Sequence, residues 1–79
     1  MHADEAAAMK RDETYAAPEY PETVRFTIRY RGVRCDESTD GRRVPIWGMY
    51  DRTGQFTGRT GYYRILRNML TDAGLILVA

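Results

Sequence analysis

Apolar and polar residues alternate without interruption from residue 24 to residue 31, in the segment Val-Arg-Phe-Thr-Ile-Arg-Tyr-Arg. A period of two is typical of a β-strand that buries one face and exposes the other. The sequence therefore predicts a first strand from about Thr23 to Arg31. Its exposed face carries three arginines, and these are Arg25, Arg29 and Arg31.

The alternation changes phase at Gly32, after which Val33 and Cys35 are the apolar positions. A β-bulge at Gly32 would explain this change, because glycine accepts the positive φ that such kinks require.

A second strand is predicted from Arg43 to Tyr50. Both of its faces are partly apolar, so the sequence leaves open which face is buried. One face holds Val44, Ile46 and Tyr50, and the other holds Pro45, Trp47 and Met49. The segment Asp51-Arg52-Thr53-Gly54 has the pattern of a tight turn. It leads into a short third strand at residues 55–57, and the glycines at 58 and 61 are expected to end the sheet.

From Tyr62 to Ala73 the apolar period changes to 3.6, which predicts an amphipathic helix. Thr60 is the expected N-cap and Gly74 the expected C′ residue. The apolar face is expected to hold Tyr62, Ile65, Leu66, Met69, Leu70 and Ala73. The apolar run at residues 75–78 then predicts a buried final strand, parallel to the first.

These elements predict an α+β fold, a small antiparallel β-meander of three or four strands with one C-terminal helix on one face and a final short strand. Residues 1–22 are expected to be an acidic N-terminal arm or a marginal helix, because their alanines form no amphipathic face. Residues 23–79 are expected to form the single compact β-β-(β)-α-β domain.

The net charge of the chain also changes sign between residues 22 and 23. Residues 1–22 hold six acids and two bases (−4), and residues 23–79 hold ten bases and five acids (+5). All ten of those bases are arginine, which suits bidentate binding of phosphate or carboxylate but also fits the codon usage of a GC-rich genome. The one cysteine, the lack of a long apolar run and the acidic start predict a cytoplasmic protein without a membrane span.

The sequence offers no set of side chains for catalysis or for a metal. The one histidine is His2, near the start of the chain, and Cys35 has no histidine to activate it. We therefore expect a protein that is not an enzyme and that has no cofactor and no metal site.

A binding surface is a better prediction, because one helix cannot cover both faces of the sheet. Trp47 and Met49 could lie beside the strand arginines, which would combine arginine with a large aromatic on one open face. Tyr62 and Tyr63 point about 100° apart on a helix, so if one is buried the other should be partly exposed. The predicted partner-binding residues are Arg25, Arg29, Arg31, Trp47, Tyr50, Tyr63 and Arg64. The alternative, that Trp47 belongs to the core and the arginines are only solvated, remains open.

In size, arginine and tyrosine content and acidic arm, the chain resembles small inhibitor proteins of phages and mobile elements, of the anti-CRISPR kind. The resemblance covers general character and no motif. It implies an inhibitor that acts in the host cytoplasm by binding a host protein complex, such as a CRISPR surveillance complex, and blocking recognition of target DNA. A homodimer is a further expectation, and a small DNA- or RNA-binding module that uses the same arginines is the alternative.

Overall fold

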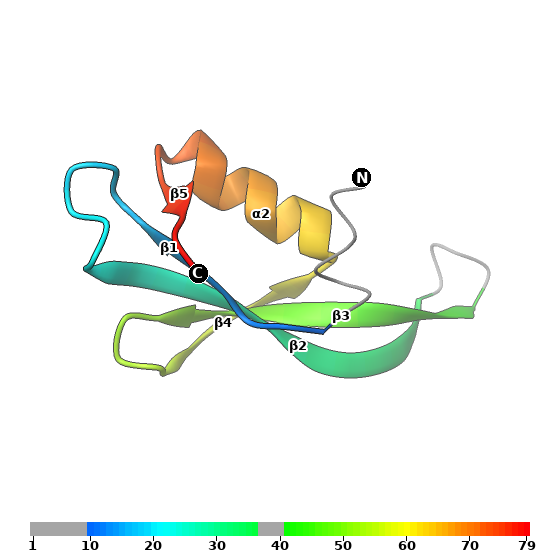
Figure 1. Ribbon diagram of the computed structural model, residues 1–79. Coiled ribbons are helices and arrows are strands. Elements are labelled where there is room, and N and C mark those ends of the chain that lie inside the picture. The colour runs from blue at the N-terminus through cyan, green and yellow to red at the C-terminus, as the bar shows by residue number, and fades with distance from the viewer. Residues whose placement is uncertain (1–9, 37–40) are drawn as a thin grey trace.

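A computed structural model describes residues 10–36 and 41–79. One helix lies on one face of a five-stranded antiparallel sheet, whose strands run in the order β4-β3-β2-β1-β5 (Figure 1). The elements are β1 (Glu13–Ala16), β2 (Val24–Asp36), β3 (Arg42–Asp51), β4 (Phe56–Gly61), α2 (Tyr63–Asp72) and β5 (Ile76–Leu77). The predicted α+β class, with a meander, a C-terminal helix and a final short strand, is confirmed.

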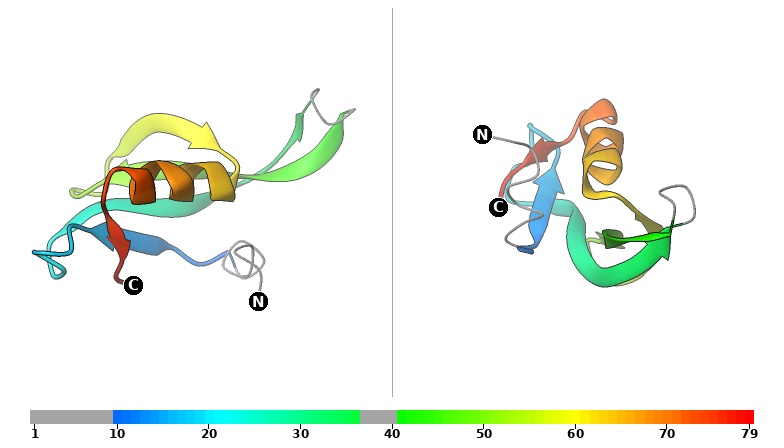
Figure 2. Two further views of the ribbon diagram at one scale, coloured as in Figure 1. Left: turned by 90° about the horizontal axis from the view of Figure 1, so that it is seen from above. Right: turned by 90° about the vertical axis from the view of Figure 1, so that its right-hand side faces the viewer.

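Strands β2 and β3 form a long hairpin that extends well past the helix (Figure 2). The register of this pair shifts between Tyr30 and Gly32, and Gly32 has a φ of 111°. The bulge predicted at Gly32 is therefore confirmed. The strand does not end there, however, and β2 continues through the bulge to Asp36.

Strand β1 was not expected, because its residues fall in the segment interpreted as an arm or marginal helix. Residues 13–16 instead lie in the interior of the sheet, between β2 and β5. Tyr15 and Ala16 are completely buried. Burial of the tyrosine ring, together with hydrogen bonding to strands on both sides, outweighs the weak helix preference of an alanine-rich segment. Residues 1–9, the rest of that predicted arm or helix, lie outside the described residues.

Strand β5 forms one edge of the sheet. It pairs antiparallel with β1, through Tyr15 with Leu77 and Ala16 with Ile76. It runs in the same direction as β2, as expected, but β1 lies between the two. The prediction of a wholly buried strand is wrong, because Leu75 is buried while Ile76 and Leu77 are about half exposed. Two hydrogen bonds extend the pairing: Thr14 N–H donates to the carbonyl of Ala79 (2.7 Å) and Val78 N–H to that of Thr14 (2.9 Å).

The junction between β4 and α2 differs from the prediction. Residues 58–61 continue the strand instead of ending the sheet, and Thr60 lies within it. The N-cap is Tyr62, which has no side-chain capping bond. The C-terminus agrees with the prediction: Gly74 has a φ of 88°, and Gly74 N–H and Leu75 N–H donate to the carbonyls of Thr71 and Leu70.

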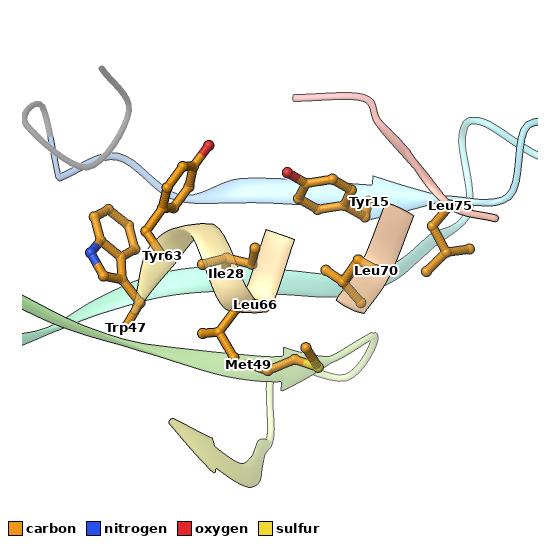
Figure 3. Packing of buried hydrophobic residues seen from close by; sticks show 8 residues of the cluster. All are labelled: Tyr15, Ile28, Trp47, Met49, Tyr63, Leu66, Leu70 and Leu75. Carbon is orange, nitrogen blue, oxygen red and sulfur yellow. The ribbon is translucent and has the colours of Figure 1, made fainter. Parts of the chain in front are cut away.

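The core lies between α2 and the sheet, and Trp47 is its largest residue (Figure 3). The Trp47 ring is 5.5 Å from that of Tyr30 and 5.3 Å from that of Tyr63. The face of β3 that carries Trp47 and Met49 is therefore the one that packs beneath the helix. The helix buries Tyr63, Leu66 and Leu70 and leaves Ile65 exposed, so its buried face is rotated from the predicted one.

Candidate binding surface

The helix leaves the opposite face of the sheet open, and the register fixes which residues that face presents. Thr27 pairs with Tyr50, and Arg29 pairs with Gly48. Their neighbours Ile28 and Met49 belong to the core beneath α2. Because successive side chains of a strand point to opposite faces, Arg29 and Tyr50 lie on the open face.

The Arg31 side chain extends across this open face from β2 to Phe56 of β4. Its guanidinium carbon is 4.1 Å from the ring centroid of Phe56, and its Nη1 donates a 2.7 Å hydrogen bond to the hydroxyl of Tyr50. Gly48 of β3 leaves room for the Arg31 side chain because glycine has no Cβ. A Cβ there would lie 2.5 Å from Arg31 Cδ, so any larger residue would displace the arginine.

Arg29 is held by two groups of the protein itself. Its Nε donates a 3.0 Å hydrogen bond to Asp12 Oδ2, and its guanidinium carbon is 4.7 Å from the ring centroid of Tyr50. Both side chains of the ion pair are about half exposed. A pair this exposed contributes little to stability, but it orients the guanidinium.

We call these four residues, Arg29, Arg31, Tyr50 and Phe56, the arginine–aromatic face. The rings of Tyr50 and Phe56 are 5.4 Å apart, so the two cations and two aromatics form one contiguous array. A guanidinium stacked on a ring has already lost much of its side-chain freedom before it meets an anion. The array is thus suited to bind carboxylate or phosphate groups on a partner.

The structure places the predicted site residues in four different environments, one of which is the core. Arg29, Arg31 and Tyr50 come together on the arginine–aromatic face. Arg25 is also exposed but lines a separate hollow toward the start of β2, and Arg64 is exposed on the helix. Sequence reasoning missed Phe56, although its position directly after a tight turn from Tyr50 made a cross-strand pair foreseeable.

Trp47 and Tyr63 do not belong to any surface, so the prediction that they bind a partner is wrong. Trp47 is completely buried and Tyr63 nearly so. The two rings pack against each other because both lie on the layer between α2 and the sheet. Neither ring is accessible to a partner in this fold.

Tyr63 instead takes part in a buried polar cluster. Glu13 Oε1 accepts hydrogen bonds from the hydroxyl of Tyr63 (2.6 Å) and from that of Tyr15 (3.0 Å). Burial, together with the hydrogen bond to Glu13, raises the pKa of Tyr63 to about 12. Burial and the charge of Glu13 likewise raise the pKa of Tyr15. The cluster joins β1 to α2 and so contributes to the fold rather than to a surface.

Among residues 10–36 and 41–79, no group of three or more histidine, cysteine, aspartate or glutamate side chains lies close enough to hold a metal ion. No helix in this part of the chain is long and apolar enough to cross a membrane. Comparison with protein-family models, curated proteins and solved structures found no match.

Proposed function

We propose that this protein is a non-enzymatic interaction protein that binds a host nucleic-acid-targeting complex in the cytoplasm and blocks recognition of its target DNA. The observation that carries the proposal is the arginine–aromatic face, where Arg29 and Arg31 are fixed over Tyr50 and Phe56. The class of partner comes from the resemblance to phage inhibitors of the anti-CRISPR kind.

The composition of this face supports a protein partner. Arginine and tyrosine are among the residues most enriched at interface hot spots, and pre-ordered side chains reduce the entropy lost on binding. The stacked rings also support this proposal over binding of single-stranded nucleic acid. Arg29 lies over one face of the Tyr50 ring and Arg31 over one face of the Phe56 ring, so a base cannot stack on those faces.

Affinity capture from a lysate of the host, followed by mass spectrometry and by a DNA-binding assay with the captured complex, tests the proposal. The wild-type chain should recover a complex and reduce its binding to target DNA. Arg31→Glu should lose both effects, because it reverses the charge at the centre of the face. Arg43→Glu, the same charge change at an exposed position near the far end of the β2–β3 hairpin, should keep both. Recovery of the bait alone would contradict the proposal.

The alternative function is a small DNA- or RNA-binding module. It is favoured by the three arginines spaced along a single strand at positions 25, 29 and 31. In that case the logarithm of affinity for nucleic acid should fall linearly with the logarithm of salt concentration, with a slope of roughly −0.7 to −0.9 for each phosphate contacted. A gel shift at low salt that finds no binding to either nucleic acid would eliminate this alternative.

A homodimer is also proposed, because β4 and β5 form the two edges of the sheet and Ile76 and Leu77 of β5 are exposed. Edge strands and exposed apolar residues gain from being covered. Light scattering at micromolar concentration should give about twice the monomer mass of 9.1 kDa. A mass of 9.1 kDa at every concentration would argue against the dimer.

A further inference from the structure

Two arginines, Arg25 and Arg52, line one hollow at the end of the sheet where β2 begins and β3 ends. The last pairs of these strands at this end are Thr27 with Tyr50 and Phe26 with Asp51. Arg25 comes directly before Phe26, and Arg52 comes directly after Asp51 in the turn that follows β3. Two like charges at one hollow repel each other and favour an anion between them.

Within residues 10–36 and 41–79, neither guanidinium has a hydrogen bond or an ion pair with another residue. Arg25 and Arg52 differ in this respect from Arg29 and Arg31, which are bound by groups of the protein. Asp51, next to Arg52, interacts with it by charge alone. Its Oδ1 accepts from Thr53 N–H (2.9 Å), Thr53 Oγ1 (2.6 Å) and Gln55 N–H (3.0 Å). The hydrogen bonds from Thr53 and Gln55 and, to a smaller extent, the charge of Arg52 lower the pKa of Asp51.

The two arginines line an open hollow of about 420 Å³, together with Ala17, Tyr20 and Thr23. This volume falls within the range of small-molecule sites, roughly 300 to 1,000 Å³. The lining residues come from the loop between β1 and β2, the start of β2 and the turn between β3 and β4. The two connections lie at the same end of the sheet (Figures 1 and 2).

Tyr20 lines this hollow, and most of its side chain is exposed to solvent. It is 66% exposed, although large aromatic side chains are usually well buried. Two successive turns hold it, since Tyr20 N–H donates to the carbonyl of Ala17 and Thr23 N–H to that of Tyr20, both at 3.0 Å. The flanking residues Pro18 and Pro21 further restrict the loop. The backbone that carries the Tyr20 ring is therefore held by turns on both sides.

We propose that this hollow binds the phosphate monoester of a nucleotide. The guanidiniums of Arg25 and Arg52 supply paired donors to different phosphate oxygens, and the Thr23 hydroxyl supplies a further donor. The base stacks on the exposed face of Tyr20. A dianion with three terminal oxygens suits two planar donor groups better than a single carboxylate does. The site is separate from the arginine–aromatic face and does not depend on the function proposed above.

Isothermal titration with adenosine monophosphate, inorganic phosphate and adenosine tests the site. Adenosine monophosphate should bind, inorganic phosphate should bind more weakly, and adenosine should not bind. Arg25→Gln and Arg52→Gln should each weaken nucleotide binding by about tenfold or more, as expected for loss of a charge-assisted hydrogen bond. Tyr20→Ala should weaken binding of the nucleotide and leave that of inorganic phosphate unchanged. Circular dichroism and thermal melting establish that each variant is folded.

The charge-matched control is Arg43→Gln, at an exposed position near the far end of β3. If this variant weakens binding as much as Arg25→Gln does, the attraction is only that of net charge and the site is overturned. Binding of adenosine as tight as that of the nucleotide would also overturn it. Arg31→Glu should leave nucleotide binding intact, which separates this result from failure of the proposed function.

A second titration identifies the source of the nucleotide and uses a single-stranded oligonucleotide with and without a 5′ phosphate. Tighter binding of the phosphorylated strand than of adenosine monophosphate supports the site and assigns it to a nucleic-acid end. Equal or weaker binding supports the site and assigns it to a free nucleotide. Binding of both strands with equal affinity, unaffected by Arg52→Gln, contradicts the proposal.

Discussion

The hydroxyl of Tyr63, at the start of helix α2, donates a 2.6 Å hydrogen bond to the carboxylate of Glu13 in strand β1. Glu13 is only 8% exposed, and the same oxygen also accepts from Tyr15. A buried carboxylate normally destabilises a fold, but here two hydroxyl donors satisfy it. The contact thus connects the N-terminal strand to a helix 50 residues away in sequence.

Replacing Glu13 by alanine should lower the free energy of unfolding by about 2 to 4 kcal/mol, because two buried hydroxyls lose their acceptor. Glu13→Gln keeps one acceptor oxygen and should cost about half as much. Urea unfolding monitored by circular dichroism measures both, with an unchanged m-value as the check that the unfolded state is comparable. Equal stability of Glu13→Ala and wild type would show that the cluster contributes nothing.

Stability should fall in alkaline solution through the same cluster. The pKa of Tyr63 is raised by burial and by its bond to Glu13 to about 12, from an ordinary value of 10.0. A raised folded pKa gives a contribution that is complete below the unfolded pKa and is lost as pH rises toward the folded one. At pH 11 the loss from Tyr63 alone should be about 1 kcal/mol.

The measurement is the urea midpoint at several values between pH 9 and pH 11. The pKa of Tyr15 is raised mainly by burial and then by Glu13, so this residue acts in the same direction. Tyr63→Phe removes one titrating group and should flatten the decline. A decline as steep in that variant as in wild type would assign the alkaline sensitivity to other groups.

Gly48→Ala should disrupt the arginine–aromatic face, because the added Cβ would occupy space that Arg31 and Phe56 now fill. The new Cβ would lie 2.5 Å from Arg31 Cδ and 3.2 Å from Phe56 Cε1, so the arginine must leave the ring. We expect a loss of about 1 to 3 kcal/mol in unfolding free energy. The NMR signals of the Arg31 Hδ protons should also lose the upfield shift that the Phe56 ring causes.

Gly61→Ala is the matched control for Gly48→Ala. Its Cβ would meet only Leu66 Cδ2, at an ordinary van der Waals distance of 3.9 Å. The control should therefore change stability by less than about 0.5 kcal/mol. If both variants lose the same stability, the close packing of Arg31 over Gly48 is not the cause.

Gly32→Ala tests the bulge in β2. A Cβ at this position meets nothing within 4 Å, so the cost is conformational and comes from a φ of 111°. We expect a loss of about 1 to 3 kcal/mol. Amide hydrogen exchange should then increase from residue 30 to residue 33 as the register loosens. A variant as stable as wild type, with unchanged exchange, would show that the bulge tolerates an ordinary residue.

The sequence predicted those parts of the fold that depend on local patterns. Strict alternation in β2, the phase change at Gly32, and the glycine after α2 each have one physical explanation, and all three were confirmed. The rotation of the helix was not predicted correctly, because Tyr63 and Ile65 are both apolar enough for a core. Packing against Trp47 decides between them, and that contact joins segments far apart in sequence.

Strand β1 could not be predicted for a related reason. Four residues are too few to establish the period of two that is typical of a strand, and a glutamate such as Glu13 is usually exposed. Two tyrosine hydroxyls, one of them from α2, satisfy the buried carboxylate of Glu13 and make its burial favourable. The same limit applies to the candidate site. Arginines on the open face followed from alternation, but the approach of Arg31 to Phe56 depends on the register of β3 with β4.

The hydrogen bonds between Thr14 and residues 78–79 close a loop of about 65 residues. Contacts between segments this far apart in sequence form only after the entropy of closing the loop has been lost. The pairing of β1 with β5 should therefore be among the last contacts to form during folding, and one side of β1 would stay open to water until then.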